Sequence, residues 1–219
     1  MIELETRGDV RVIHWRDGEN RFNRASVTAW HETLDELEAV TDRLALVATG
    51  EGKFFSNGLD LDSFGGDPSA AGEVIEGVHR LLGRLLVFPA YTVAALNGHA
   101  FAAGAMLTTT FDRRLMREDR GYWCLPEVDL GLPLTEAMVA AVTARLPTGT
   151  ILEAMNSGHR YPAAEALAAG LVEGTASEED LLDRAVGTAA ALAAKDRSVI
   201  ATHKRLVLGP AARACGWEA

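Results

Sequence analysis

Val93-Ala-Ala-Leu-Asn-Gly-His-Ala-Phe-Ala-Ala-Gly-Ala-Met-Leu-Thr-Thr-Thr-Phe-Asp112 is the stretch around which the rest of the chain is organised. An apolar run from Tyr91 to Leu96 overlaps the start of this stretch and predicts a short strand. The strand is predicted to end at the turn residues Asn97-Gly98. Small residues follow, and apolar side chains then return at helical spacing. A helix is therefore predicted to begin between Ala102 and Gly104.

The small residues between these two elements have two interpretations. In the first, they let another molecule approach bare backbone amides, and the free N–H groups at a helix start attract negative charge. In the second, Ala and Gly only allow the helix to pack closely on a sheet. This stretch alone leaves both interpretations open.

Composition narrows the class of protein. Of the 219 residues, 48% are apolar and 24% are charged, which is typical of a soluble protein with one large domain and a small appendage. The 31 acidic residues exceed the 21 basic ones, and a net charge of −10 disfavours binding to nucleic acid or anionic lipid. We therefore expect neither a nucleic acid nor a membrane as a partner.

Cysteine usage and the N-terminal segment indicate the compartment. Cys124 and Cys215 fit neither a metal-binding spacing nor a disulfide framework, and no signal-like segment precedes the first strand pattern. No apolar run approaches the length of a membrane span. We expect a cytoplasmic protein without a metal site.

Hydrophobic periodicity predicts an α/β protein. Strands are predicted at residues 2–6, 10–15, 44–49, 91–96 and 113–116. Further helices are predicted at residues 26–40, 70–86, 135–146, 151–155 and 163–168, capped at Ser26 and Thr135 in two cases, and two alanine-rich helices end the chain. No strand is predicted between 50 and 61, and 122–133 is predicted as an apolar loop. The alternation of strands and helices, with helices dominant late, indicates α/β layers and a helical C-terminal piece.

Three spaced motifs carry a resemblance to a known family. They are Lys53-Phe-Phe-Ser-Asn-Gly-Leu-Asp-Leu61, Ala94-Ala-Leu-Asn-Gly-His-Ala-Phe-Ala-Ala-Gly104 and Leu125-Pro-Glu-Val-Asp-Leu-Gly-Leu132. Together they resemble the enoyl-CoA hydratase/isomerase (crotonase) superfamily. Within it, the chain is most similar to the Δ3,Δ2-enoyl-CoA isomerases, especially the short plant-type ones, and Arg117-Glu-Asp-Arg-Gly121 adds to this likeness.

The resemblance implies a fold and a ligand. It implies an α/β crotonase-like spiral of repeated ββα units in residues 1–175, which carries the active site, and a helical trimerisation region in residues 176–219. It also implies an acyl-CoA thioester as substrate and a homotrimer or a dimer of trimers. No separate cofactor is expected, because coenzyme A is part of the substrate.

The resemblance places two oxyanion-hole amides in the first two motifs. They are the backbone N–H groups of Leu59 and Ala103, and the substrate is expected to contact their neighbours Asn57, Gly58 and Gly104. Two converging donors at a helix start stabilise an oxygen as it gains charge. The first motif, taken alone, is more often a plain turn at Ser56-Asn57-Gly58 than part of such a site.

The same resemblance places the catalytic carboxylate at Glu127. Its neighbours are apolar, and such surroundings disfavour the charged form of a carboxylate and make it a stronger base. Without the motifs, Glu127 is equally interpreted as a surface residue after a proline. Asp129 is the rival carboxylate, and we expect it to cap or orient the following turn instead.

One position departs from the hydratase pattern. Hydratases of the family place a second glutamate two residues after the position of Gly104, and this chain has Met106 there. A thioether cannot take a proton from water, so hydration lacks half of its groups, while one base is enough for an isomerisation. We expect Met106 to contact the substrate.

Weaker candidates surround these motifs. His99 is expected to be a structural donor or a surface group more often than a ligand contact, and Ser56 near Asp60 lacks a positioned histidine for a hydrolase triad. Lys204 and Arg205 resemble a family position that meets the CoA phosphates from a neighbouring subunit, and are equally interpreted as solvated charges.

The C-terminal helices carry apolar faces that a domain of this size is not expected to bury alone. We expect these faces to pack on a neighbouring subunit; they comprise Leu181, Leu182, Ala185, Val186, Val199, Ile200, Leu206 and Val207.

Three classes of function remain after these observations. The favoured one is an acyl-CoA isomerase that moves a 3-enoyl double bond to the 2-trans position. A hydratase or another thioester-enolate enzyme is the alternative within the superfamily, and a non-catalytic acyl-CoA-binding or RNA-binding member is the alternative outside catalysis. The net charge disfavours RNA, and Glu127 disfavours a purely binding role.

Overall fold

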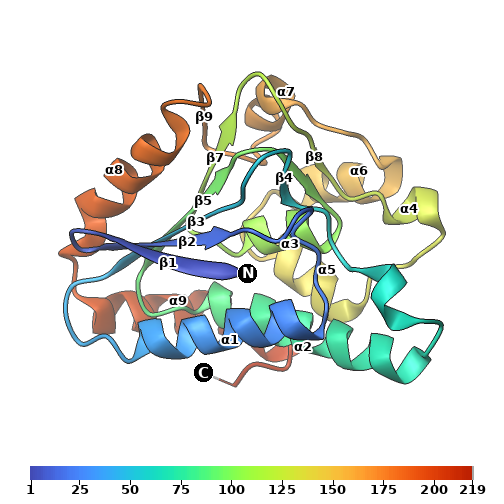
Figure 1. Ribbon diagram of the computed structural model, residues 1–219, viewed down its shortest axis with the longest axis horizontal. Coiled ribbons are helices and arrows are strands. Elements are labelled where there is room, and N and C mark those ends of the chain that lie inside the picture. Colours follow the sequence, from blue (N-terminus) through green and yellow to red (C-terminus); the bar gives the residue numbers. More distant parts are fainter. Residues whose placement is uncertain (219) are drawn as a thin grey trace.

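A mixed sheet of six strands forms the centre of the protein in a computed structural model that describes residues 1–218 (Figure 1). Only β1 and β2 are antiparallel, and every other neighbouring pair is parallel. The strands lie in the order β1 (Ile2–Arg7), β2 (Val10–Trp15), β3 (Ala45–Thr49), β5 (Tyr91–Leu96), β7 (Arg113–Arg117) and β9 (Gly174–Ala176). The predicted strands of this sheet are therefore confirmed, and β9 is an addition that the sequence did not predict.

A second, smaller sheet stands beside the first. It contains β4 (Phe54–Ser56), β6 (His99–Phe101) and β8 (Trp123–Cys124), all parallel, in that order. The prediction of turns and loops for these segments is wrong. Strands of two or three residues are too short to show an alternating pattern, so the sequence alone did not distinguish them from loops.

Helices cover the sheets on both faces (Figure 1). The predicted helices are confirmed with shifted ends; they are α1 (Arg24–Glu38), α2 (Pro68–Leu86), α3 (Ala103–Thr109), α5 (Glu136–Thr143), α6 (Thr148–Ser157) and α7 (Ala163–Ala168). Thr135 caps α5 as predicted. Asn23, not Ser26, caps α1, because the Asn23 carboxamide accepts from Ser26 N while the Ser26 hydroxyl accepts from Asn23 N in a capping box.

Two one-turn elements were also missed. The 3₁₀ helix η1 (Leu61–Phe64) follows the first motif, and α4 (Glu127–Leu130) lies within the predicted apolar loop. Both are about one turn long, which is too short for a helical period to appear in the sequence.

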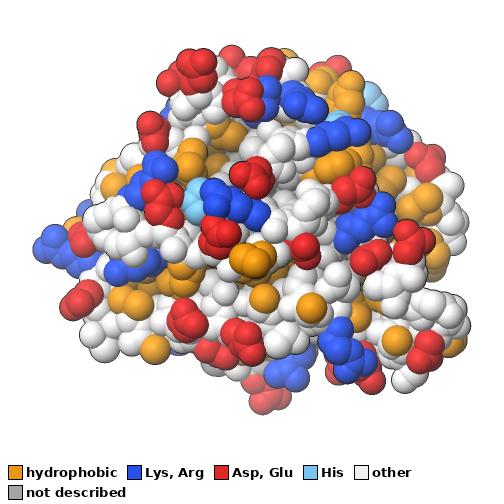
Figure 2. Space-filling model, in the orientation of Figure 1, with side chains coloured by type: hydrophobic (Ala, Val, Ile, Leu, Met, Phe, Trp, Pro, Cys, Tyr) orange, Lys and Arg blue, Asp and Glu red, His pale blue; other side chains and the backbone are white. Residues whose placement is uncertain are grey.

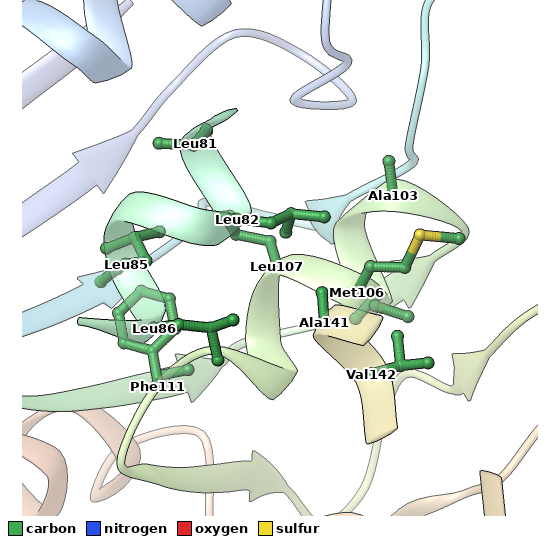
Figure 3. Packing of buried hydrophobic residues seen from close by; sticks show 14 of the residues in the cluster. Leu81, Leu82, Leu85, Leu86, Ala103, Met106, Leu107, Phe111, Ala141 and Val142 are labelled. Carbon is green, nitrogen blue, oxygen red and sulfur yellow. The ribbon is translucent and has the colours of Figure 1, made fainter. Parts of the chain in front are cut away.

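The larger core joins α2, α3 and α5 (Figure 3). Leu107 of α3 points toward Leu82 and Leu86 of α2, whereas Met106 leaves α3 on the side of Ala103. All of these side chains are buried. The packing fixes the rotation of α3 and thereby holds its first turn in place.

The two C-terminal helices, α8 (Leu181–Ala193) and α9 (Arg197–Ala214), pack differently. Leu181 and Ala185 of α8 are buried against the large sheet of the same chain. The prediction that this face packs on a neighbouring subunit is therefore wrong. In α9, by contrast, Val199, Leu206 and Val207 are 46%, 75% and 74% exposed, so the corresponding prediction for α9 stays a prediction.

Charged side chains of both signs are interspersed with apolar ones over the face shown in Figure 2. Within residues 1–218, none of the helices combines the length and the apolar composition that a membrane span requires. The division of the chain at residue 175 stays a prediction.

Candidate active site

A cavity of about 560 Å³ lies where the three sequence motifs meet. The parallel pairing of β4, β6 and β8 places the ends of the three motifs side by side. The motif residues that line the cavity are Asn57, Leu59, Leu61, Phe101, Ala102, Ala103, Pro126, Glu127, Leu130 and Leu132, and Met106 and Cys124, which lie next to the motifs in the chain, also line it. The small sheet thus assembles one site from segments about 70 positions apart in the chain.

The first two motifs approach each other closely. Gly58 has a φ of +80°, and a Cβ placed there would lie 2.8 Å from Ala102 Cβ and 3.4 Å from Ala103 N. A Cβ at Gly104 would lie 2.5 Å from the carbonyl oxygen of Ser56. Neither glycine can therefore carry a side chain without moving the two segments apart.

The amides of Leu59 and Ala103 are free at this junction. Gly58 O accepts from Phe22 N, and Asp60 N donates to Phe22 O, which fixes the peptide groups on both sides of Leu59. Ala102 has a φ of +51°, an uncommon conformation for a non-glycine residue, and Ala103 begins α3. Among residues 1–218, neither amide has a hydrogen-bond acceptor, so both can donate to a ligand atom in the cavity.

Glu127 lies at the start of α4 with its carboxylate in the cavity. Its Oε2 atom is buried and has no hydrogen-bond partner. Burial among apolar groups raises the pKa of Glu127 from 4.5 to about 7. A carboxylate with this pKa, next to two free amides, can move a proton at neutral pH.

Met106 occupies the wall of the same cavity, where it is 1% exposed. Of the described residues that line the cavity, Glu127 alone carries a carboxylate. Asp129 is exposed, and its side chain lies against Gly158 outside the cavity. One base and two amide donors are therefore the reactive groups that the motifs bring together.

The match to a family model follows from this geometry. Residues 5–214 match the model described as enoyl-CoA hydratase/isomerase. The chain belongs to this family. Its α/β fold with a helical C-terminal region, predicted from the resemblance, is confirmed by solved structures of the crotonase fold.

Curated members of the enoyl-CoA hydratase/isomerase family resemble the chain over most of its length. It is 35% identical over 204 residues to enoyl-CoA delta isomerase 3 of Arabidopsis thaliana, covering 89% of this chain and 86% of the relative. It is 30% identical over 179 residues to a probable enoyl-CoA hydratase of Bacillus subtilis, covering 80% of this chain and 68% of the relative.

Solved structures of the family also superpose closely. An apo enoyl-CoA isomerase of Mycobacterium tuberculosis is 27% identical, with a TM-score of 0.88, and the alignment covers 98% of this chain and 94% of the other. Another structure of the same mycobacterial protein is described as a probable enoyl-CoA hydratase, with 27% identity, a TM-score of 0.89 and coverage of 98% and 91%. The comparisons thus support the family, and the names of the relatives include both isomerases and hydratases.

Lys204 is not where the sequence suggested. Its ammonium lies 2.6 Å from Asp112 Oδ2 and donates to Ala90 O at 2.8 Å, and the Lys204 and Asp112 side chains are each only 8% exposed. Burial lowers the pKa of Lys204, and Asp112 opposes this effect. Lys204 is thus neither a solvated charge nor a residue able to reach a neighbour's ligand, because the fold uses its charge to hold α9 against the core. Arg205 is exposed and lies outside the cavity.

Other candidates take structural positions. Ser56 is fully buried, its hydroxyl donates to Asn20 O, and it lies outside the cavity lining. The Asn57 amide donates to Glu19 Oε2. His99 lies outside the cavity lining. Within residues 1–218, His, Cys, Asp and Glu side chains form no group of three that could bind a metal ion.

Sequence reasoning missed part of the cavity wall. Thr135, which caps α5, Met138 of α5 and Arg160 also line it. No local motif marks Arg160, whose position depends on the turn between α6 and α7. Phe64 of η1 and Ile75 of α2, between the first two motifs, also line it.

Proposed function

We propose that the protein is a Δ3,Δ2-enoyl-CoA isomerase, which moves the double bond of a 3-enoyl-CoA to the 2-trans position. The observation that carries this proposal is the single carboxylate, Glu127, in an apolar cavity where Met106 occupies the position of the second hydratase glutamate. The delta isomerases of Arabidopsis thaliana among the relatives add support.

The reaction begins with proton removal. In its ionised form, Glu127 accepts a proton from C2 of the 3-enoyl thioester, and the C2–H electron pair passes into a dienolate. The negative charge gathers on the thioester oxygen, where the N–H groups of Leu59 and Ala103 donate to it. Preorganised donors of this kind contribute on the order of 3 kcal/mol each to lowering the barrier.

The second step returns the same proton. The Glu127 carboxyl delivers it to C4, the double bond forms between C2 and C3, and the thioester carbonyl is restored. A pKa near 7 suits both steps, because the group must accept a proton and then release it at neutral pH.

The rival activities need groups that the cavity does not offer. Hydration requires a second general acid or base to hold and activate water, and the buried thioether of Met106 provides neither. A purely binding role would not require a carboxylate held at high pKa beside two free donors.

We also propose that the protein is cytoplasmic and assembles as a homotrimer or a dimer of trimers, for which the exposed apolar side chains of α9 provide a surface.

A comparison of two substrates tests the proposal. Purified protein should convert a 3-enoyl-CoA to the 2-trans isomer at least tenfold faster than it hydrates the 2-trans ester, because isomerisation needs one base whereas hydration needs a second acid or base. A tenfold difference in rate corresponds to about 1.4 kcal/mol between the two barriers. Chromatography of both mixtures separates the isomer from the 3-hydroxy product. Hydration as the faster reaction would contradict the proposal.

A further inference from the structure

The first oxyanion-hole segment is tied down at every amide except the one that is free for a ligand. Of the four consecutive amides at positions 57 to 60, three donate to acceptors of this chain. Those acceptors, in chain order of the donors, are Glu19 O, Ser56 Oγ and Phe22 O, at 3.0, 3.3 and 2.9 Å. The Leu59 amide, third of the four, has no acceptor within residues 1–218. The direction of its N–H is therefore set by the bonds of its neighbours.

Two of these acceptors belong to the loop between β2 and α1, which comprises residues 16–23. In return, Phe22 N donates to Gly58 O at 2.8 Å. The loop thus runs beside the segment like an extra strand, with Phe22 and Leu59 as partners in an isolated parallel bridge. A displacement of this loop would rotate the Leu59 peptide and turn its free N–H away from the cavity.

Asn20 anchors the loop to β4. It is fully buried; its Nδ2 donates to Phe54 O and Phe55 O at 3.3 and 3.1 Å, and its Oδ1 accepts from Asp17 N at 2.8 Å. Asn20 has a φ of +52°, a left-handed conformation that Asn tolerates better than most residues. Of the described non-glycine residues, the other with a positive φ is Ala102, beside the second donor. Such uncommon conformations concentrate at functional sites.

Ser56 joins this loop to both oxyanion donors. Its hydroxyl donates to Asn20 O at 2.7 Å and accepts from Gly58 N at 3.3 Å. On its other side Ser56 meets the first turn of α3, because a Cβ at Gly104 would lie 2.6 Å from Ser56 Cβ and 2.7 Å from Ser56 Oγ. One buried residue therefore sets the separation between the two donor segments.

We propose that Ser56 and Asn20 are positioning residues for the reaction: together they aim the Leu59 N–H at the thioester oxygen and hold it at a fixed distance from the Ala103 N–H. Both act through the backbone, because neither side chain lines the cavity. The reaction rests on the proposed function, whereas the hydrogen bonds that aim the donor rest on the structure itself. Since such donors act on charge as it develops, misdirecting one slows the chemistry more than it weakens binding.

Removal of one hydroxyl tests this positioning. Ser56→Ala takes away a single oxygen and leaves Asn20 O and Gly58 N without their partner. The kcat for a 3-enoyl-CoA should fall roughly tenfold or more, while KM stays within about twofold. Complete loss of an oxyanion donor costs about 10²–10³-fold, and here the donor is misdirected rather than removed. An unchanged kcat, or a rise in KM alone, would overturn the proposal.

A second variant reaches the same donor from the loop. Asn20→Gly keeps the positive φ without strain and removes the three hydrogen bonds of the carboxamide. It should also lower kcat roughly tenfold or more at nearly constant KM. In the double variant with Ser56→Ala, the fall should be smaller than the product of the two single effects, because both residues act on one peptide group. Fully multiplicative effects would overturn their joint role.

A matched control separates positioning from stability. Thr49 is also buried, and its hydroxyl donates to Ala95 O at 2.9 Å in the large sheet, away from the cavity lining. Thr49→Val removes a buried hydroxyl of the same kind and should lower Tm about as much as Ser56→Ala does. Its kcat and KM should equal those of the wild type at a temperature where all variants are folded. A fall in kcat as large as that of Ser56→Ala would reduce the effect to stability and overturn the proposal.

Vibrational spectroscopy makes the test independent of turnover. A saturated acyl-CoA with a ¹³C-labelled carbonyl cannot isomerise, and hydrogen bonds from Leu59 and Ala103 should lower its C=O stretching frequency in the wild-type complex. In Ser56→Ala and Asn20→Gly the frequency should lie closer to that of the free thioester, and in Thr49→Val it should match the wild type. This pattern in a protein without isomerase activity would overturn the proposed function and keep the positioning. An equal displacement in the wild type and both variants, or none in the wild type, would overturn the positioning.

Discussion

Replacing Glu127 by Gln separates the catalytic use of this carboxylate from its cost to stability. Burial raises the pKa of Glu127 from 4.5 to about 7. Between these values the folded protein keeps a proton that the unfolded chain releases, so the free energy of unfolding falls as the pH rises through this window. The difference of about 2.5 pH units, at about 1.4 kcal/mol each, gives at most about 3 kcal/mol of destabilisation at pH 8.

The Glu127→Gln variant has nearly the same shape and removes this ionisation. At pH 8 its free energy of unfolding should exceed that of the wild type by about 1–3 kcal/mol, less than the full effect because the buried amide also lacks partners. At pH 5 the two proteins should differ little. For a chain of this length, each kcal/mol corresponds to about 2–4 °C in Tm, so thermal unfolding at both pH values resolves the effect.

The same variant should lose turnover. Removing the sole base should lower kcat by on the order of 10³-fold while leaving the affinity for an acyl-CoA within about tenfold. In the wild type, kcat/KM should rise with pH up to an apparent pKa near 7, since the ionised carboxylate removes the proton. A variant that keeps near-wild-type turnover, or whose stability gain is the same at pH 5 and pH 8, would refute the reasoning.

Three other substitutions test separate parts of the structure. Gly58→Ala places a methyl group 2.8 Å from Ala102 Cβ, so it should displace an oxyanion donor and lower kcat by about 10²-fold or more in a steady-state assay; wild-type kcat would contradict the junction described above. Lys204→Ala removes one of the two cations beside the buried Asp112, which keeps Arg145 and Thr92 as partners, and should lower the free energy of unfolding by about 1–3 kcal/mol in urea; an unchanged free energy of unfolding would contradict the buried pair. Met106→Glu should add measurable hydration of a 2-trans-enoyl-CoA at the expense of stability, and an unchanged hydration rate would show that a second carboxylate here is not sufficient.

Five of the six strands of the large sheet, all except β9, could be predicted from the sequence because their signal is local. The run from Tyr91 to Leu96 is apolar except for Thr92, and the structure buries it between two layers. The strands β4, β6 and β8 could not be predicted in this way, because each has three residues or fewer and depends on pairing with partners distant in the chain. Yet these strands assemble the site.

The candidate site was predictable where backbone motifs define it. Gly58 and Gly104 mark the close approach of two segments, and that approach leaves the amides of Leu59 and Ala103 free. The apolar neighbours of Glu127 correctly indicated a raised pKa.

Burial of charges was the main feature that the sequence did not reveal. Lys204 has the spacing of a surface lysine on a helix, and only the packing of α9 shows that it pairs with Asp112. Arg160, by contrast, stays exposed and lines the cavity, and nothing in its local sequence indicates this position. Which charges stay free depends on tertiary contacts between segments distant in the chain.

Transfer of deuterium between two carbons of one substrate tests the central claim most directly. A 3-enoyl-CoA carrying deuterium at C2 is incubated with the protein in ordinary water, and the product is examined by mass spectrometry and NMR at the first few per cent of conversion. In the proposed mechanism, one sheltered carboxyl, Glu127, carries the proton between the two carbons, so this mechanism predicts deuterium at C4 of the 2-trans product. A product with only protium at C4 from the earliest time would show that water or a second group delivers this proton, and would contradict the one-base account.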